Sequence, residues 1–345
     1  MMRPREPGAA MKAVIGLALA AWCLIPLSYR FFQPFLSTAD KDASMYALAA
    51  KNFVRYGFIP TRLGMTLNTG DNPPRFSYYD HHPPGVPLAA AVVYAVAGVS
   101  DWGARIYPGL CTLGSAGVLF LIWRRHRGAG PALLAVAVVA TLPAFGHFGL
   151  KLGEEAPTFF WGLLAVLLYG NWKHHEEAIG WRGLVPCLAV YALGCGSGWA
   201  AFYVGPLLMI DALVTLNGHR ARQRLALAGL AVTGAGCFAL VLGHIAWNAG
   251  SLDAILAAAR SRFVPPAGAA ASGPGIGEWL AREGGYFVRL FGTQSAILGT
   301  AGVLSGVVAI VRGRWRTDVA LTVIVLAGFG VSHVVAFRWA AFYHD

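Results

Sequence analysis

Charged residues are scarce in this sequence of 345 residues. Asp, Glu, Lys and Arg together make up 12% of it, whereas a soluble domain carries about 25%. Hydrophobic residues make up 57%, and the mean hydropathy is +0.56. This balance excludes an ordinary cytosolic protein, a disordered protein and a nucleic-acid-binding domain. We therefore interpret the chain as a polytopic membrane protein whose surroundings are a lipid bilayer, and we expect no nucleic acid as a partner.

Sequence motifs for nucleotides and for zinc are also lacking. There is no P-loop and no GxGxxG between a strand and a helix, so no motif cradles a nucleotide. The five cysteines all fall in apolar runs, and no two of them have CxxC spacing. We interpret them as buried free thiols.

Nine apolar runs are candidates for membrane spans, which need about 20 mainly apolar residues each. They cover residues 13–32, 104–123, 130–148, 156–172, 182–198, 200–216, 225–248, 296–311 and 318–337. The run 87–100 is shorter, and we expect it to lie in the interface without crossing. The fold class is therefore an all-α polytopic membrane protein with about nine transmembrane helices.

Basic residues decide the orientation of these spans. If the run 87–100 does not cross, one side of the membrane receives the basic clusters Arg3/Arg5/Lys12, Arg124/Arg125/Arg127, Lys173/Arg182, Arg220/Arg222/Arg224 and Arg312/Arg314/Arg316. Short cytoplasmic loops are rich in Lys and Arg. We therefore expect a multi-pass protein of the cell (inner) membrane with a cytoplasmic N-terminus and an external C-terminus. Asp211, near the inner end of a span, is expected to reach the interface or to pair with Arg220 or Arg222.

We expect one membrane domain over residues 1–345, with two long external loops at 33–103 and 249–295, each containing an interfacial amphipathic helix. In the first loop, Met45, Leu48, Ala49 and Phe53 have helical spacing within a predicted helix from Asp42 to Tyr56. Thr38 or Asp40 is a candidate cap for its start, and Gly57 suits its end.

Three polar segments fall on the external side in this topology. The first contains Asp40, Asp42 and Tyr46, of which the last two are an i,i+4 pair on one helix face. A carboxylate there can accept a proton from a hydroxyl or help to hold a divalent cation. The spacing equally suits a helix cap at Asp40 and a favourable dipole interaction at Asp42.

The other two segments combine basic and acidic groups. His81 and His82 precede Pro83-Pro84, and a histidine can donate a hydrogen bond or positive charge to a phosphate; a rigid interfacial turn explains the same residues. The third segment, Lys151 to Pro157, contains Glu154 and Glu155. Ionisable residues beside a membrane are functional candidates, although Lys151 alone would suit snorkelling and Glu155 a helix start.

Taken together, carboxylates and cations on one face suit group transfer from a membrane-anchored phosphate donor. The carboxylates would activate the acceptor, and the cations would stabilise the departing phosphate. Outside the cytoplasm, a lipid-linked donor is the more natural substrate.

These residues also resemble a known family. The stretch from Asp42 through Tyr46, Ala50 and Asn52 to Gly57 resembles the DxxxYxxxAxNxxxxG pattern in the first periplasmic loop of GT-C glycosyltransferases, and more narrowly of the protein O-mannosyltransferase and aminoarabinose-transferase superfamily. His82-Pro83-Pro84, Ala104-Arg105 and the segment 151–155 match later family segments. The resemblance covers roughly residues 12–215.

The resemblance implies sugar transfer from a polyprenyl-phosphate donor to a glycan, lipid or protein acceptor, usually with inversion at the anomeric carbon. It implies that Asp42 is the catalytic carboxylate, that Asp40 completes a DxD-like motif, and that Glu155, or else Glu154, is the second acid. It places His82 facing the lipid phosphate, with Tyr46, His81, Lys151 and Arg105 as further substrate-binding residues. It leaves metal use undecided. Because members commonly have further spans, it also implies a chain truncated at the C-terminus.

Two other functions are compatible with a polytopic membrane chain. A secondary transporter or flippase would be expected to show inverted repeats and charges at mid-membrane, and the sequence shows neither. A non-catalytic membrane subunit is the other alternative.

Overall fold

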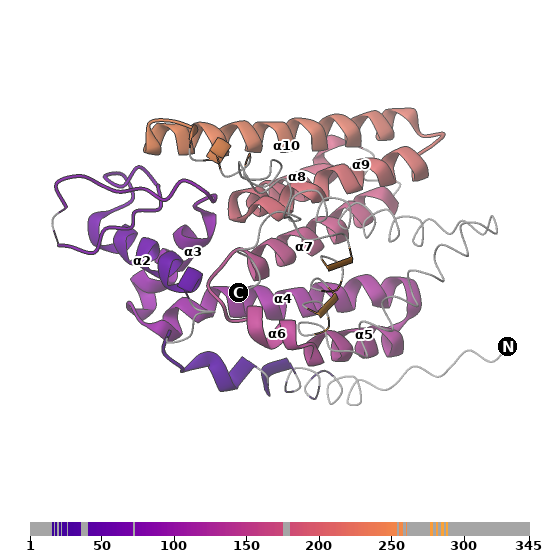
Figure 1. Ribbon diagram of the computed structural model, residues 1–345. Helices are drawn as coiled ribbons and strands as arrows, with labels where there is room; N and C mark the ends of the chain where they lie inside the picture. Colours follow the sequence, from indigo (N-terminus) through magenta and orange to yellow (C-terminus); the bar gives the residue numbers. More distant parts are fainter. Residues whose placement is uncertain are drawn as a thin grey trace.

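The described part of the chain is built from helices. In the computed structural model (Figure 1), the residues described are 41–71, 73–174 and 180–253, with further residues scattered over 16–35 and 255–288. Apart from one isolated antiparallel bridge between Thr66 and Tyr78, the regular elements in this part are all helical. The predicted all-α class is confirmed for this part.

The helices coincide with most of the predicted apolar runs. Their bounds are α2 Lys41–Tyr56, α3 Gly85–Ala97, α4 Asp101–Arg127, α5 Ala129–Thr141, α6 Pro143–Phe148, α7 Glu155–His174, α8 Trp181–Ser197, the 3-10 helix η3 Trp199–Tyr203, α9 Val204–Thr215 and α10 Arg220–Ala249. The run 13–32 is described only in part, and most of the loop 249–295, the last two runs and the C-terminal basic cluster lie outside the described residues.

One predicted span is in fact two helices. We expected residues 130–148 to form a single helix, but α5 ends at Thr141 and α6 begins at Pro143. Proline lacks an N–H donor and disfavours helical backbone in the residue before it. Leu142 accordingly has φ −65° and ψ 134°, which is extended backbone. The prediction was wrong at this point because the proline was counted within an apolar run.

Two described helices, α4 with 27 residues and α10 with 30, are long and apolar enough to cross a membrane. At 1.5 Å per residue they extend about 40 and 45 Å, which exceeds a hydrocarbon core of about 30 Å. The apolar helices α3, α5 and η3–α9 are shorter. Several apolar helices are therefore shown, whereas the total of nine spans stays a prediction.

Helix α2 confirms the expected element and its end. It stops at Tyr56, and Gly57 has φ +87° with its N–H donated to the carbonyl of Phe53 at 3.0 Å; this left-handed backbone is readily adopted by glycine. Its buried face matches the predicted one only in part. Ala49 and Phe53 are buried as expected, and so are Ala43 and Tyr46, whereas Met45 and Leu48 are only half-buried, because α2 packs against α3.

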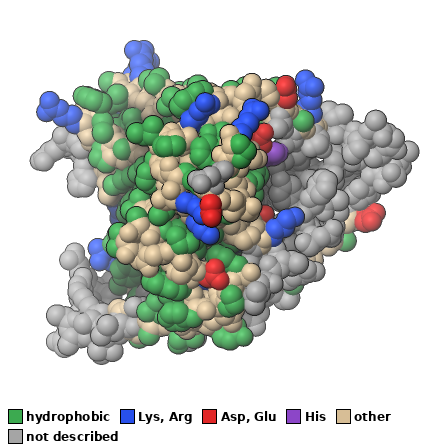
Figure 2. Space-filling view, turned by 90° about the vertical axis from the view of Figure 1, so that its left-hand side faces the viewer, with side chains coloured by type: hydrophobic (Ala, Val, Ile, Leu, Met, Phe, Trp, Pro, Cys, Tyr) green, Lys and Arg blue, Asp and Glu red, His purple; other side chains and the backbone are tan. Residues whose placement is uncertain are grey.

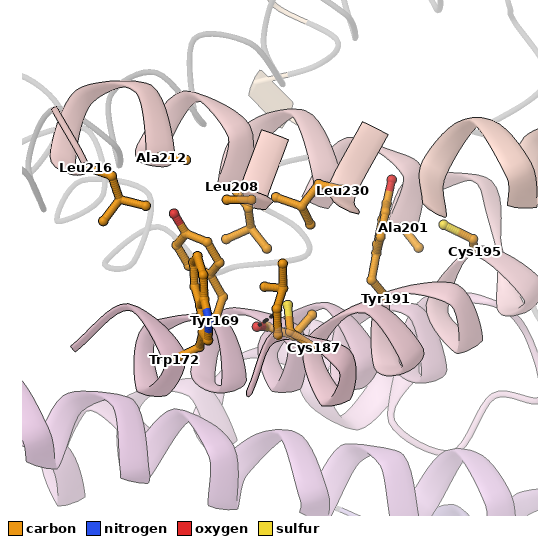
Figure 3. Packing of buried hydrophobic residues seen from close by; sticks show 13 residues of the cluster. Tyr169, Trp172, Cys187, Tyr191, Cys195, Ala201, Leu208, Ala212, Leu216 and Leu230 are labelled. Atoms are coloured by element: carbon orange, nitrogen blue, oxygen red, sulfur yellow. Dashed lines mark hydrogen bonds between the residues drawn. The ribbon is translucent and has the colours of Figure 1, made fainter. Parts of the chain in front are cut away.

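The main core joins α7, α8, η3, α9 and α10. Figure 3 shows Tyr169 and Trp172 of α7 facing Leu208 and Leu216 of α9. Buried cysteines and small residues fill the remaining space between these helices: Ala165, Cys187, Cys195, Ala201, Ala212 and Ala226. Four of the five cysteines are buried and all five are free thiols, as predicted.

The long helices connect two chemically different ends of the molecule. In Figure 1, α4, α7, α8 and α10 lie lengthwise, and α2 and α3 pack at one end. The segments 78–82 and 149–155 meet at that end, which we call the acidic end. The C-terminal turns of α4 and α7 and the start of α10 meet at the other, which we call the basic end. The 20 residues of α7 separate the two ends by about 30 Å.

Figure 2, which looks onto the acidic end, shows many hydrophobic side chains, with basic and acidic side chains adjoining one another among them. Exposed apolar residues continue along the flanks of the long helices, for example Val232 and Leu240 on α10, which are 72% and 74% exposed. Large exposed apolar surface of this kind is unusual for a soluble protein and suits contact with lipid.

A close backbone contact positions the acidic end. A Cβ atom at Gly85, the first residue of α3, would overlap the carbonyl oxygen of Gly196 in α8. Because backbone cannot yield as a flexible side chain does, we expect Gly85→Ala to destabilise the protein by about 1–3 kcal/mol, measured as a lower midpoint of thermal unfolding in detergent. The matched control is Gly196→Ala, whose Cβ would meet nothing within 4 Å. Equal midpoints for the two variants would contradict this account of the contact.

Candidate active site

The structure brings the three predicted polar segments together at the acidic end. Lys151 Nζ lies 3.6 Å from Asp42 Oδ2 and 3.0 Å from Glu155 Oε1. Beside this group, His82 Nδ1 lies 3.3 Å from Glu154 Oε2. These five residues, which we call the polar cluster, come from the start of α2, the turn before α3, and the segment leading into α7.

Lys151 is the centre of charge in the polar cluster. Its side chain is only 12% exposed, whereas that of Asp42 is 65% exposed. Burial lowers the pKa of Lys151, but the carboxylates of Glu155 and Asp42 more than offset this effect and raise the pKa above its ordinary value. Lys151 is therefore a fixed cation at neutral pH, held between two carboxylates.

Asp42 and Glu155 both have acceptor capacity to spare. One oxygen of Glu155, Oε2, is buried and accepts no hydrogen bond from the part of the chain that the structure describes. Asp42 reaches Lys151 through Oδ2, and most of its side chain is exposed. Both carboxylates can therefore accept a hydrogen bond or a proton from a hydroxyl.

Glu154 joins the turn before α3 to the start of η3. Its Oε2 accepts a hydrogen bond from the backbone N–H of Trp199 at 3.2 Å and lies against His82 Nδ1. A Cβ on Gly198 would overlap this same oxygen. Glycine at that position thus leaves the space that the Glu154 carboxylate occupies, and a His82 Nδ1–H directed at the carboxylate would leave Nε2 for another partner.

Aromatic rings surround His82. The ring of Tyr79 is nearly parallel to it, with centroids 5.7 Å apart and an interplanar angle of 8°. Tyr46 lies on α2, with its ring centroid 6.3 Å from that of His82. Burial, and then the charge of Glu154, raise the pKa of Tyr46 above its ordinary value, so Tyr46 acts as a neutral phenol.

His81 has a different setting from His82. Its Nδ1 lies 2.6 Å from Asp80 Oδ1, and its backbone carbonyl accepts a hydrogen bond from the indole N–H of Trp199 at 2.6 Å. The two adjacent histidines therefore contact different carboxylates: His81 contacts Asp80, and His82 contacts Glu154.

Arg105 lies in α4 and is 1% exposed. Its guanidinium donates a hydrogen bond to the carbonyl of Gln33 at 2.9 Å and lies 4.6 Å from the centroid of the Phe35 ring. Arg105 thus holds the segment that follows the first predicted span against α4. Its contact with substrate stays a prediction. Asp40, the other member of the predicted DxD-like motif, lies outside the described residues.

A metal site needs several ligating side chains close together. Among them, no three His, Cys, Asp or Glu side chains lie close enough together to hold a metal ion. The Lys151 ammonium, itself a cation, contacts both Asp42 and Glu155. These residues therefore do not form a metal-ligand set, and we derive no step through a metal.

A small cavity lies beside His82 of the polar cluster. A cavity of about 10 Å³ lies between Tyr79, His82 and the C-terminal part of α10, where His244 and Asn248 line it. That volume is about the size of one water. His244 and Asn248 hydrogen-bond to each other at 3.0 Å, and His244 Nε2 lies 2.9 Å from the carbonyl of Arg62, so α10 braces the first loop.

Trp199 is a part of the site that sequence reasoning missed. It follows the glycine-rich segment 194–198 and reaches the site through its backbone and indole N–H groups. Such contacts depend on where the backbone passes. The adjacency of Trp199 to a glycine-rich helix end was the one available signal.

About half of the chain matches the model of a known protein family. Residues 81–247 match the model of the family described as dolichyl-phosphate-mannose-protein mannosyltransferase. This segment is similar to that family, which consists of membrane glycosyltransferases of the GT-C class. The predicted family resemblance is thereby confirmed. Comparison with curated proteins gives no match.

Three solved structures align with the chain, and those with TM-scores above 0.5 share its fold. The oligosaccharyltransferase AglB from Archaeoglobus fulgidus, in complex with an inhibitory peptide and a dolichol-phosphate, aligns with a TM-score of 0.58 and 13% identity over 98% of this chain and 49% of that chain. A second structure of an oligosaccharyltransferase from this organism, with zinc and sulfate, gives 0.54 and 15% over 94% and 46%. ArnT from Cupriavidus metallidurans, in the apo state, gives 0.48 and 19% over 68% and 42%. The chain thus spans less than half the length of these proteins.

Proposed function

We propose that this chain is a glycosyltransferase that moves a sugar from a polyprenyl-phosphate donor to an acceptor hydroxyl at the external face of the membrane. The observation that carries the proposal is the polar cluster, in which Asp42, Lys151 and Glu155 form one contact chain and Glu154 holds His82 beside it. The family match supports the donor class. So does the dolichol-phosphate in the AglB complex.

The reaction assigned to the cluster is a single displacement. Asp42 accepts the proton of the acceptor hydroxyl while the acceptor oxygen forms a bond to the anomeric carbon. The bond from that carbon to the phosphate oxygen breaks, and the polyprenyl phosphate leaves with the electron pair. Attack from the side opposite the leaving group inverts the anomeric carbon.

The contacts of the other site residues suggest their roles in the reaction. Lys151 supplies a fixed positive charge beside Asp42, and His82 presents its second ring nitrogen to the departing phosphate. Glu155 accepts a hydrogen bond from a sugar or acceptor hydroxyl through its unpartnered oxygen, and Glu154 is a positioning residue for His82. Tyr46 and Tyr79 limit the space around the imidazole.

The donor assay tests this function directly. Purified protein is incubated in detergent with labelled polyprenyl-phosphate sugars and with a membrane extract as the source of acceptor. The expected products are free polyprenyl phosphate and a labelled glycan, lipid or protein. An intact donor after incubation under conditions in which a related transferase is active would overturn the proposal, as would a transmembrane flux of intact donor without covalent product.

The external placement of the site rests on charge. The basic end carries Arg124, Arg125 and Arg127 at the end of α4 and Lys173 near the end of α7, and the positive-inside rule assigns such clusters to the cytoplasm. The length of α7, about 30 Å, supports a position of the polar cluster at the opposite leaflet.

Cysteine labelling measures this orientation. Ser77 in the first loop and Gly130 at the start of α5 are both exposed, and a side chain at Gly130 would meet nothing within 4 Å. We expect an impermeant maleimide to label Ser77→Cys in intact cells and Gly130→Cys only after lysis, while the native cysteines react little because four of the five are buried. The reverse pattern would place the polar cluster in the cytoplasm.

A further inference from the structure

Trp199, the first residue of η3, contacts two segments of the site that are far apart in the sequence. Its indole N–H donates a hydrogen bond to the backbone carbonyl of His81 at 2.6 Å. Its backbone N–H donates another to Glu154 Oε2 at 3.2 Å, and His82 Nδ1 lies 3.3 Å from that same carboxylate oxygen. One residue thus joins the turn that carries His82 to the acid that holds the His82 ring.

Aromatic packing holds the indole ring of Trp199 in place. Its centroid lies 5.7 Å from that of Phe202 in η3 and 6.2 Å from that of Phe238 in α10. The two phenylalanines also pack edge to face, with centroids 5.7 Å apart. Aromatic rings at such separations attract one another. The direction of the indole N–H is therefore set by this packing as well as by the hydrogen bond to His81.

The backbone at Gly198 brings Trp199 to the Glu154 carboxylate. Gly198 follows the last residue of α8 and has extended backbone, with φ −178° and ψ 160°. Because a Cβ atom there would overlap Glu154 Oε2, only glycine lets the carboxylate lie against the next N–H, that of Trp199. The Glu154 carboxylate is therefore held by the main chain. It offers His82 Nδ1 a fixed acceptor, which orients the imidazole ring.

We propose that Trp199 is a positioning residue for sugar transfer, and that it acts by fixing the His81-His82 turn relative to Glu154. The inference rests on the proposed function, because it assigns Trp199 to the same reaction. Both N–H groups of Trp199 donate within the protein, so Trp199 acts through His82 and not on the substrate. Without the indole hydrogen bond the His82 ring shifts relative to the donor phosphate, and a small shift of a catalytic group lowers the rate.

The test replaces Trp199 with phenylalanine, which keeps an aromatic ring and the backbone N–H but removes the indole N–H. In the donor assay we expect kcat to fall about tenfold, the effect of losing one hydrogen bond, and the KM for the donor to change by less than about twofold. The matched control is Trp161→Phe in α7, which removes an indole hydrogen bond to the Tyr107 hydroxyl at 3.3 Å. That bond reaches neither the histidine turn nor Glu154, so we expect the wild-type kcat.

A double-mutant cycle shows whether the effect passes through His82. In a His82→Ala background, Trp199→Phe is expected to change kcat by less than about twofold, because the ring that Trp199 positions is no longer there. A merely structural role would give the same loss in both backgrounds, and such additive losses would overturn the inference. If Trp199→Phe does not fold, Phe238→Leu loosens the indole packing from α10 and is expected to lower kcat about threefold with the same dependence on His82.

Hydrogen–deuterium exchange provides a readout that does not need activity. We expect amide exchange in the segment 78–82 to become severalfold faster in Trp199→Phe and to stay unchanged in Trp161→Phe, because the first variant alone releases the turn. Unchanged exchange in Trp199→Phe would overturn the inference. Wild-type protein that leaves the donor intact would remove the proposed function and this inference with it. Wild-type protein that transfers sugar no faster than Trp199→Phe would remove this inference alone.

Discussion

Replacing Asp42 with asparagine is expected to reduce sugar transfer by about 10²–10⁴-fold, the usual contribution of a positioned general base. The amide cannot take the proton of the acceptor hydroxyl, although it keeps the size and the acceptor oxygen of the carboxylate. Because the Asp42 side chain is 65% exposed, we expect its loss to change the free energy of unfolding by no more than about 0.5 kcal/mol. The measurement is the initial rate of polyprenyl phosphate release.

The matched control for this variant is Asp253→Asn. Asp253 is an exposed acid of the second long loop, and its backbone N–H, not its carboxylate, contacts Ser251. We expect wild-type rates there. If Asp42→Asn retained full transfer while its thermal midpoint was unchanged, Asp42 would have no part in proton transfer, although the remainder of the site would be unaffected.

Replacing Lys151 with glutamine is expected to lower kcat by about 10²–10³-fold, the range found when one preorganised donor to a developing negative charge is removed. The substitution removes the cation between Asp42 and Glu155, so two carboxylates face each other without compensation. Since the Lys151 side chain is only 12% exposed, a loss of about 1–3 kcal/mol in stability is also expected. Steady-state kinetics and thermal unfolding in detergent measure the two effects separately.

The pH dependence adds a second readout for Lys151. Its pKa is raised, so its interaction with the two carboxylates is fully present below the ordinary lysine pKa and is lost only as the pH rises through the raised value. The ratio of wild-type to Lys151→Gln activity should therefore be constant between about pH 7 and about pH 9. Lys51→Gln, an exposed position on α2, is the control. A ratio that fell within this range would show that Lys151 loses its proton there.

Apolar runs predicted most of the described helices because a long uncharged segment has few alternatives to a helix. The runs 104–123 and 225–248 lie within α4 and α10, and Gly57 ends α2 as its position predicted. The positive-inside count also placed Asp42, His82 and Glu155 on one side, and the structure brings their segments into contact. The helical periodicity did not fully predict which face of α2 is buried, because Tyr46 is buried and Met45 is only half-buried.

Contacts made through the backbone could not be predicted from the sequence. The hydrogen bond from Trp199 N–H to Glu154, and the approach of Gly85 to the Gly196 carbonyl, depend on where two chain segments pass in space. The partner of Asp211 was also misassigned, because residues near in sequence were considered and Lys173 comes from a different helix.

Glu154 and Glu155 are consecutive in the chain but serve different partners, His82 and Lys151. Successive side chains at a helix start project about 100° apart. A single-residue insertion or deletion between positions 149 and 153 that shifted this segment by one position would therefore bring one acid into the place of the other. When homologous chains are aligned, a gap misplaced by one position there would assign the catalytic role to the wrong acid. The contact of each acid with His or Lys identifies its role more reliably than its position in the alignment.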